Sequence, residues 1–384
     1  MIAPMSATIA GAHKTNFSSF IREEFALFIS LGTAGVLLVI GNAPLENLTH
    51  PFVTGLLFLW LFGIVLWSAI CVARHADFLA LKCGEPYGTL ILTLAAISIE
   101  VAMISTAMLH GANNPTLARD AMFAVIMIAL NALVGLSLLL GGLRHHEQQY
   151  NLQGTNSYLN AIITLTVLGL ILPNFTTSVT APRYSRPQEI FEIIISLALY
   201  GVFLLIQTSR HRQHFTDSQS ATTAADQHHP SGPMRSTAFH AVMLIVYLAA
   251  VVVLAEKFAI PLDNSIERFG MPLALGGAIV AALVLAPEGL SAVRASLGNQ
   301  LQRSVNLLLG SVLATIGLTI PAVLIIGFVT QREVTLGLEG GTFPLLLLTL
   351  AASVVTFASG RTNVLQGCIH LVLFATFVLL IFCP

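Results

Sequence analysis

Long runs of apolar residues separated by short polar segments dominate the sequence. Each run is about as long as the ~20 residues that a helix needs to cross a bilayer. Eleven such spans are predicted, at residues 25–41, 52–73, 87–109, 120–142, 158–180, 188–209, 238–257, 271–293, 304–330, 343–359 and 363–382. These runs are too long and too uniformly apolar for the alternating strands of a membrane barrel. The pattern predicts an all-α polytopic membrane protein with about 11 transmembrane helices.

The longest polar stretch, residues 210–236, is rich in Ser, Thr, Gln and Pro, as in a flexible linker. It divides the chain into a cytoplasmic N-terminal segment (1–24), a leading helix with a first five-helix repeat (25–209), the linker itself, and a second five-helix repeat (237–384). An odd number of helices in each half gives the halves opposite orientations in the bilayer. Inverted repeats of this kind are typical of transporters.

Composition and charge place the chain in a membrane and orient it. Only 9% of the 384 residues are charged, 55% are hydrophobic, and the mean hydropathy is +0.84. The net charge of −1, without a basic stretch, argues against nucleic acid as a partner. The expected partner is the lipid bilayer, and a homo-oligomer is compatible with the sequence. Eleven of the 17 Lys and Arg residues fall on one side of the predicted topology, so we expect the N-terminus in the cytoplasm and the C-terminus outside the cell (inner) membrane.

Two glutamates deep inside predicted spans are the strongest functional signal. Glu100 is the only Asp, Glu, Lys or Arg between Tyr87 and Ala118, and Glu288 is the only one between Phe269 and Val293. A charge at the bilayer centre costs about 2.5–3.5 kcal/mol on insertion scales, so such residues usually serve function. The alternative is a carboxyl kept for packing or for capping a neighbouring helix. We predict that these two glutamates, one in each half of the chain, bind a cation or a proton.

Oxygen ligands for a cation lie near both glutamates. Thr89 and Thr93 share a helical face with the first glutamate, and Ser291 follows the second by three residues. Pro287 lacks an amide proton and frees a backbone carbonyl in the preceding turn. Carboxylates, hydroxyls and carbonyls are the ligands that Ca²⁺ and similar hard cations take. Helix packing by the hydroxyls and a simple kink at Pro287 are the alternatives.

Polar residues in three other places have two interpretations each. Asn306, Ser311 and Thr315 form a stripe along the ninth span, and Asn131 lies in the fourth. Each stripe lines an ion path or forms a seam between packed helices. Glu85, at the mouth of the third span, is a gate carboxylate or an acid favoured by the helix dipole.

Cysteine and histidine patterns suggest no resident cofactor. The four cysteines lie far apart without metal-ligand spacing, so neither a disulfide framework nor a zinc site is implied. Most of the 12 histidines fall in loops or at predicted membrane edges. His370, inside the last span, is expected to form hydrogen bonds to a neighbouring helix.

Three segments carry a specific family resemblance: GEPYGTLILTLAAISIEVAMI (84–104), LAPEGLSAV (285–293) and NLLLGSVLATIGLTIP (306–321). They closely resemble the ChaA-type cation/proton antiporters, in the calcium/proton exchanger group of the calcium/cation antiporter superfamily. The resemblance implies that Glu100 and Glu288 take the places of the family's two mid-membrane acids, and that Ser311 matches the serine after the second signature. The glycine and asparagine that commonly precede those acids in the wider family are absent, which weakens the case for strict calcium selectivity.

The resemblance implies a secondary active antiporter that exports cytoplasmic Ca²⁺, Na⁺ or K⁺ in exchange for protons by alternating access, with no cofactor. The alternative is a cation channel without obligatory proton coupling, against which the lack of a TVGYG-like filter argues weakly. An intramembrane enzyme is disfavoured, because the spans contain no GxSxG motif and no interior aspartates that face each other. The sequence does not rank the three cations.

Overall fold

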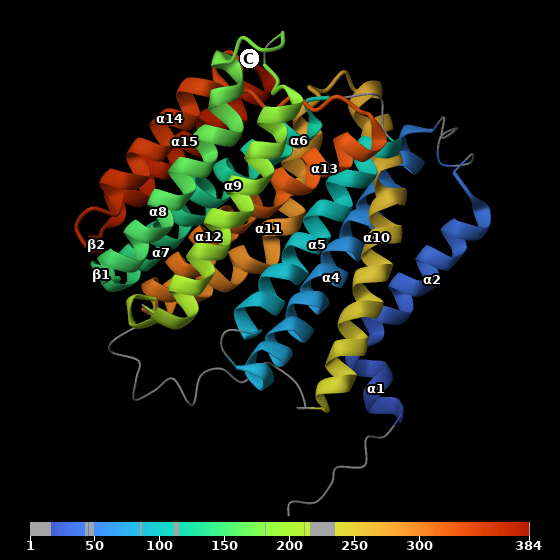
Figure 1. The fold of residues 1–384 in the computed structure, drawn as a ribbon. Coiled ribbons are helices and arrows are strands. Elements are labelled where there is room, and N and C mark those ends of the chain that lie inside the picture. The colour runs from blue at the N-terminus through green and yellow to red at the C-terminus, as the bar shows by residue number, and fades with distance from the viewer. Residues whose placement is uncertain are drawn as a thin grey trace, which may run out of the picture.

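The computed structural model describes residues 17–42, 45, 50–84, 87–110, 115–180, 182–210, 212–215 and 235–383. In Figure 1 the helices run side by side between two opposite faces, with α1 at one face and the C-terminal end at the other. Within the described residues, eight helices are long and apolar enough to cross a membrane. The protein is therefore polytopic and α-helical, as the apolar pattern predicts. Three shorter apolar helices, Phe25–Ile40, Leu90–Thr106 and Thr342–Thr356, overlap the other three predicted spans.

The first half of the chain is a series of helices in which some contain a π or 3₁₀ turn, labelled η. Its elements are α1 (Phe17–Glu23), α2 (Phe25–Ile40), α4 (Pro51–Cys83), α5 (Tyr87–His110), α6 (Leu117–Met127), η1 (Ile128–Leu133), α7 (Val134–His145), β1 (Gln148–Gln149), α8 (Leu152–Thr166), η2 (Val167–Ile171), η3 (Leu172–Phe175), α9 (Arg186–Leu205), η4 (Ile206–Arg210) and η5 (Arg212–His214). Most of the predicted linker lies outside the described residues.

The second half begins with the same sequence of helix lengths as the first half after α2. Its elements are α10 (Thr237–Arg268), α11 (Ala274–Leu297), α12 (Leu301–Ala314), η7 (Thr315–Thr319), α13 (Ile320–Thr330), α14 (Thr342–Thr356), β2 (Arg361–Thr362) and α15 (Val364–Phe382). Helices α4 and α10 have 33 and 32 residues, and α5 and α11 have 24 each. The next spans, 117–145 and 301–330, are each interrupted by a π turn. Strands β1 and β2 pair antiparallel and join the two halves at one face.

Several span boundaries predicted from hydropathy were wrong. Helices α4 and α10 continue well beyond the predicted ends at 73 and 257. A hydropathy window stops at a charge, whereas a helix continues wherever its polar side chains find partners. Arg74 pairs with Glu24 at 2.6 Å, and Lys257 donates to Asn42 at 2.6 Å. The span predicted at 158–180 instead leaves the helical state after Phe175, beyond a 3₁₀ turn that contains Pro173.

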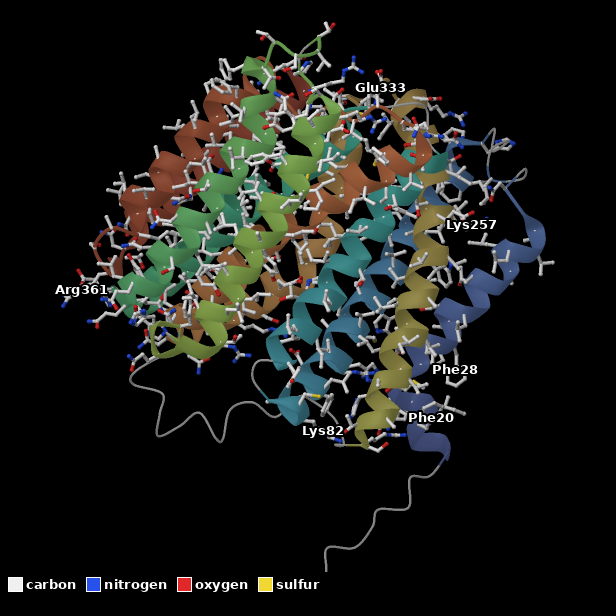
Figure 2. All side chains as sticks on the ribbon, in the orientation of Figure 1. Phe20, Phe28, Lys82, Lys257, Glu333 and Arg361 are labelled. Carbon is white, nitrogen blue, oxygen red and sulfur yellow. The ribbon has the colours of Figure 1, made fainter. Side chains whose placement is uncertain are left out.

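Side-chain caps fix the starts of α8 and α15 at the face where β1 and β2 pair. Asn151 accepts hydrogen bonds from the backbone amides of Gln153 and Gly154 at the start of α8. Asn363 does the same at the start of α15, and Gln366 completes a capping box by reaching back to the Asn363 amide. Such caps satisfy amides that have no partner inside the helix. Charged side chains lie toward the ends of the bundle, as Figure 2 shows for Lys82 and Glu333 at opposite ends.

Two separate hydrophobic cores hold the bundle together. One core joins buried residues of α2, α4 and α10, with Tyr247 and Phe258 among its largest side chains. The other joins α6, η1, α7, α8, α9 and α12 to α15, around Tyr158 and Phe357. Helices α5 and α11 contribute side chains to both cores. The two cores therefore meet along α5 and α11.

A buried ionic cluster ties the N-terminal helices to α4 and α10. The Glu24 carboxylate accepts hydrogen bonds from Arg74 at 2.6 Å and from the Tyr247 hydroxyl at 3.0 Å, and it lies 3.4 Å from His75. Burial alone would raise the pKa of Glu24, but the His75 hydrogen bond and the Arg74 charge outweigh it and hold that pKa below its ordinary value. The His75 ring is in turn 3.0 Å from His240 on α10. Helix α4 therefore contacts α10 and the N-terminal segment through one polar network.

Close helix crossing in the second core depends on glycine. A Cβ atom added to Gly367 on α15 would lie 2.6 Å from the backbone nitrogen of Leu139 and 2.9 Å from the Gly135 carbonyl on α7. Backbone atoms of a packed helix cannot move aside as a side chain can. We predict that Gly367→Ala lowers the unfolding free energy by about 1–3 kcal/mol, because overpacking a core costs that much.

The matched control for this prediction is Gly201→Ala on α9, where an added Cβ would meet nothing within 4 Å. Heating the detergent-solubilised protein and measuring the remaining monodisperse fraction by size-exclusion chromatography gives the melting temperature of each variant. Equal melting temperatures for the two variants would contradict the prediction.

Candidate cation site

The two predicted glutamates lie at mid-height of two adjacent helices. Glu100 is 13 residues after Tyr87, the first residue of α5, and Glu288 is 14 residues after Ala274, the first residue of α11. Helices α5 and α11 pack against each other. The Glu100 and Glu288 carboxyls are close enough to interact electrostatically. The structure thus brings together the two residues that the sequence singles out, one from each half of the chain.

Glu100 is almost completely enclosed, with a relative exposure of 2%. One carboxyl oxygen, Oε2, accepts a hydrogen bond of 2.7 Å from the Thr315 hydroxyl. Thr319, one helical turn beyond, interacts with the same carboxyl without reaching hydrogen-bond geometry. Its second oxygen, Oε1, is buried without a hydrogen-bond partner. A buried acceptor without a donor is costly, so this oxygen calls for a proton or a cation.

Glu288 is more accessible than Glu100. Glu288 as a whole is half-buried, yet its Oε2 atom is enclosed and has no hydrogen-bond partner. Ser291, one turn along α11, is exposed. Carboxyl oxygens with free lone pairs, next to threonine hydroxyls, form the kind of oxygen set that binds Ca²⁺, Na⁺ or K⁺.

A π turn presents the threonines to Glu100. Thr315 and Thr319 are the first and last residues of η7, which ends two residues before Pro321. Proline has no amide proton, so it cannot donate to the carbonyl four residues earlier, that of Gly317. The backbone hydrogen bonds of the helix change there from the α pattern to the wider π pattern. Such π bulges occur often at functional sites, because they redirect side chains.

Two of the predicted polar residues belong to packing contacts instead. Asn306 donates to the Phe215 carbonyl at 2.6 Å and accepts from Gln302 at 2.8 Å. Thr93 lies close enough to the Tyr200 hydroxyl on α9 to interact with it. Neither side chain contacts the Glu100 carboxyl among the contacts of the described residues. Helical spacing placed Thr93 on the face of Glu100, but seven residues along a helix are about 10 Å.

Asn131 lies in a packing seam around the η1 turn. Its side-chain amide donates to the Thr349 hydroxyl at 2.9 Å, and its Oδ1 accepts a hydrogen bond from Nδ1 of His370 at 3.0 Å. His370 also lies 3.0 Å from the Thr356 hydroxyl. The prediction that His370 bonds to a neighbouring helix is confirmed. Of the two interpretations of Asn131, these contacts favour the seam.

The remaining predicted residues are placed only in part. Ser311 is half-buried on α12, one turn before Thr315. The side chain of Thr89 and the whole of Glu85 lie outside the described residues.

Three ionisable residues inside the long helices escaped the sequence analysis. Glu192 on α9 is 1% exposed and accepts a hydrogen bond of 3.0 Å from Ser196. Asp77 on α4 is exposed and lies near Glu288. Asp263 on α10 lines a small pocket. The two aspartates lie past the predicted ends of their spans, so a search for charges inside apolar windows could not find them. Glu192 lies inside one such window and carried the usual signal of an intramembrane acid.

Comparisons with known proteins identify the family of the chain. The family described as sodium/calcium exchanger protein matches residues 52–209 and 239–383. The chain is 42% identical to the sodium-potassium/proton antiporter ChaA of Escherichia coli (strain K12), over 94% of this chain and 97% of that one.

Two solved structures share the fold. Native YfkE superposes with a TM-score of 0.71 at 17% identity and covers 93% of this chain and 100% of its own. The H⁺/Ca²⁺ exchanger CAX superposes with a TM-score of 0.65 at 15% identity and covers 94% of this chain and 89% of its own. Because the family match spans most of the sequence in two blocks, one on each side of the linker, the chain belongs to the sodium/calcium exchanger protein family.

Proposed function

We propose that this protein is a secondary active antiporter that exports cytoplasmic Ca²⁺, Na⁺ or K⁺ in exchange for protons. The observation that carries the proposal is the pair of enclosed carboxyl oxygens, Oε1 of Glu100 and Oε2 of Glu288, that have no hydrogen-bond partner. The cation and the proton would compete for these atoms. The names of the relatives fit this exchange, since one is a sodium-potassium/proton antiporter and another an H⁺/Ca²⁺ exchanger.

Competition follows from the chemistry of buried carboxyls. An enclosed carboxylate without a counter-charge is unfavourable, so an empty site takes up a proton. A metal cation that enters from the cytoplasm replaces the proton and is held by the carboxylate oxygens and the Thr315 hydroxyl. The protein then exposes the site on the other side, where the higher proton concentration reverses the exchange. The transported ion is cargo, and no cofactor takes part in this scheme.

The two hydrophobic cores supply the moving parts. In this proposal α2, α4 and α10 move as one body against the larger core, and the boundary between the bodies runs along α5 and α11, where the glutamates lie. Sliding of one body exposes the site to one side at a time, which is alternating access. A channel would need a continuous open path and free conduction. The enclosure of Glu100 favours the antiporter over the channel.

We further propose the complete topology. The eight long helices and the three shorter apolar ones would give eleven spans, arranged as a leading helix and two inverted five-helix repeats. The N-terminus would lie in the cytoplasm and the C-terminus outside the inner membrane. The matched helix lengths of the two halves and the Lys and Arg distribution support this layout.

Two native cysteines test the topology. Cys83, at the end of α4, and Cys383, after the end of α15, are both exposed thiols. We expect a variant that keeps only Cys383 to react with a membrane-impermeant maleimide in intact cells, and a variant that keeps only Cys83 to react in everted vesicles. Labelling of both cysteines from the same side would contradict the eleven-span layout. A variant that keeps only the buried Cys71 is the control and should stay unlabelled until it is denatured.

The central prediction concerns the carboxyl charges. Glu100→Gln keeps an oxygen that can accept the Thr315 hydrogen bond but removes the negative charge. Glu288→Gln likewise removes the negative charge of the carboxylate on α11. We expect exchange to fall by at least about 100-fold in each variant, because removing one partner of a buried charge pair costs about 3–5 kcal/mol. The rate of exchange is measured in everted vesicles with an acidic interior. A pH-sensitive dye follows proton movement when CaCl₂, NaCl or KCl is added.

The control for this experiment is Glu333→Gln, which removes an exposed carboxylate that pairs with Arg183 away from the site. It should exchange at the normal rate. Normal exchange by either folded site variant would overturn the proposal. Cation-driven currents without proton movement in the unsubstituted protein would favour the channel instead.

A second prediction concerns the donor to Glu100. Thr315→Val has nearly the same shape but lacks the hydroxyl, so one carboxyl oxygen loses its donor and the cation loses a ligand. We expect the cation KM to rise by about 10-fold, because a hydrogen bond to a charged group is worth about 1.5–3 kcal/mol. Thr315→Ser, which keeps the hydroxyl, should stay within about 2-fold of the unsubstituted protein. Equal KM values for the valine and serine variants would exclude a role for the hydroxyl.

A further inference from the structure

Two aspartates occupy matching positions on the two longest helices. Asp77 lies 26 residues after Pro51, the first residue of α4, and Asp263 lies 26 residues after Thr237, the first residue of α10. The two helices pack along each other more extensively than any other pair, and Figure 1 shows them running side by side. Because they run in opposite directions across the bundle, the aspartates lie toward opposite faces.

Asp77 lies near Glu288, toward the face of the bundle opposite to Asp263. Its side chain is exposed, and it is close enough to Glu288 for their charges to interact. Arg303, at the start of α12, also lies within electrostatic range of Asp77 and is exposed. A cation that approaches Glu288 from this face would therefore pass an exposed carboxylate.

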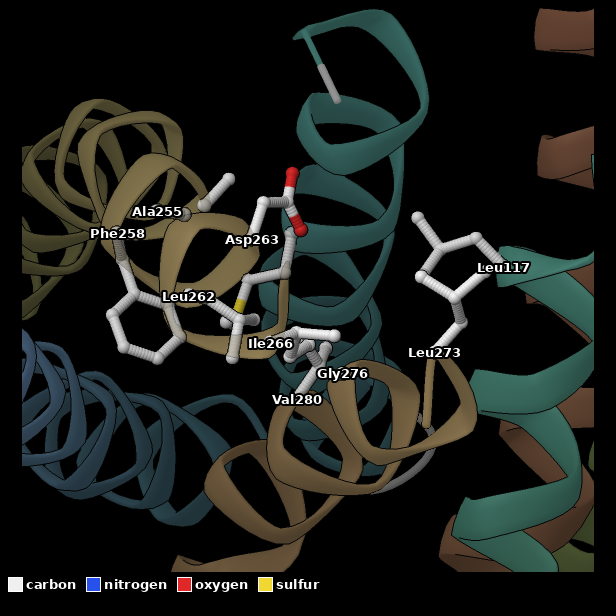
Figure 3. A pocket seen from close by; sticks show the side chains of 11 residues that line it. Leu117, Ala255, Phe258, Leu262, Asp263, Ile266, Leu273, Gly276 and Val280 are labelled. Atoms are coloured by element: carbon white, nitrogen blue, oxygen red, sulfur yellow. The ribbon is translucent and has the colours of Figure 1, made fainter. Parts of the chain in front are cut away.

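Asp263 lines a pocket on the opposite side of the glutamates. Figure 3 shows its carboxyl at the wall of this pocket, with Leu117 and Leu273 across from it. The pocket also contains Met103, three residues after Glu100 on α5, and Val280, eight residues before Glu288 on α11. Asp263 is half-buried, and within electrostatic range of it lies Glu267, one turn further along α10. The pocket is otherwise mostly apolar.

Apolar side chains separate this pocket from the glutamates. Met103 and Val280 are 3% and 6% exposed, and they stand between the pocket and the level of Glu100 and Glu288 along their helices. On the other side, Ser291 and Asp77 are exposed. Asp77 is thus exposed near one face, whereas Asp263 lies in a pocket that Met103 and Val280 separate from the glutamates. The two aspartates hold equivalent places on the two sides of the glutamates.

We propose that Asp77 and Asp263 are paired gate carboxylates, which bind the exchanged cation on the inner and the outer path respectively. A carboxylate in a cleft with low-dielectric walls raises the local concentration of cations and speeds their capture. Asp77 does this beside Glu288 in the state described here. Asp263 does it when α4 and α10 slide and the contact of Met103 and Val280 opens. This inference rests on the proposed antiport, and it adds a carboxylate on each side of the central site.

Each gate carboxylate acts on one face of the membrane only, which distinguishes it from a structural residue. In everted vesicles, where added cation reaches the inner face, we expect Asp77→Asn to raise the cation KM by about 3- to 10-fold and Asp263→Asn to leave it unchanged. In right-side-out vesicles added cation reaches the outer face and drives the reverse exchange. There we expect Asp263→Asn to raise the cation KM and Asp77→Asn to leave it unchanged. The cation is the one of Ca²⁺, Na⁺ and K⁺ that gives the strongest signal with the unsubstituted protein.

Charge-conserving and matched variants complete the test. Asp77→Glu and Asp263→Glu should restore most of the affinity. Glu256→Gln removes a carboxylate of α10 that pairs with Lys257 and does not line the pocket, so its KM should be normal on both faces. Equal KM changes on both faces, or no change in either aspartate variant, would overturn the inference and leave the antiport itself standing. Loss of cation-driven proton movement in the unsubstituted protein would instead refute the antiport.

Discussion

An enclosed carboxyl group needs a donor, a proton or a cation for each of its oxygens, and Glu100 has a donor for only one. Thr315 supplies that donor, and the second oxygen is left without a partner at the boundary between α5 and α11. Glu288 adds another unpartnered oxygen from the other half of the chain. In the proposed antiporter an ion from outside meets this deficit, which the protein itself leaves unmet.

The two hydrophobic cores suit the proposed alternating access. A site enclosed in one continuous core could take up an ion only by local unfolding, because close-packed interiors do not deform continuously. Here the glutamates lie where two cores meet, and in the proposed mechanism one core shifts without breaking the packing of the other. Glycines such as Gly367 and Gly135 bring helices of the larger core into backbone contact, which suits a rigid scaffold. The smaller core is tied by polar contacts among Glu24, Arg74 and Tyr247.

Irregular backbone concentrates where the helices of the larger core carry polar groups. The η7 turn holds Thr315 and Thr319 at the glutamate, whereas the η1 turn holds Asn131 in a network with Thr349 and His370. Equivalent turns thus place hydroxyls at a buried carboxyl in one half and serve helix packing in the other. This difference arises from the neighbours, since Asn131 meets polar groups of α14 and α15, whereas Thr315 meets a carboxyl on α5.

The sequence by itself determined the polytopic helical class, the approximate positions of the helices and the pair Glu100 and Glu288. Apolar run length and the cost of a charge in hydrocarbon are local properties, and both can be read along the chain. Only the tertiary structure decided which polar side chains face the glutamates. Asn306 and Thr93 are polar residues in apolar spans, as Thr315 is, but they have partners elsewhere. The tertiary structure also decided that Asp77 and Asp263 lie inside long helices. A charge ends an apolar window in sequence, whereas a helix continues as long as a neighbouring chain segment supplies partners for its polar side chains.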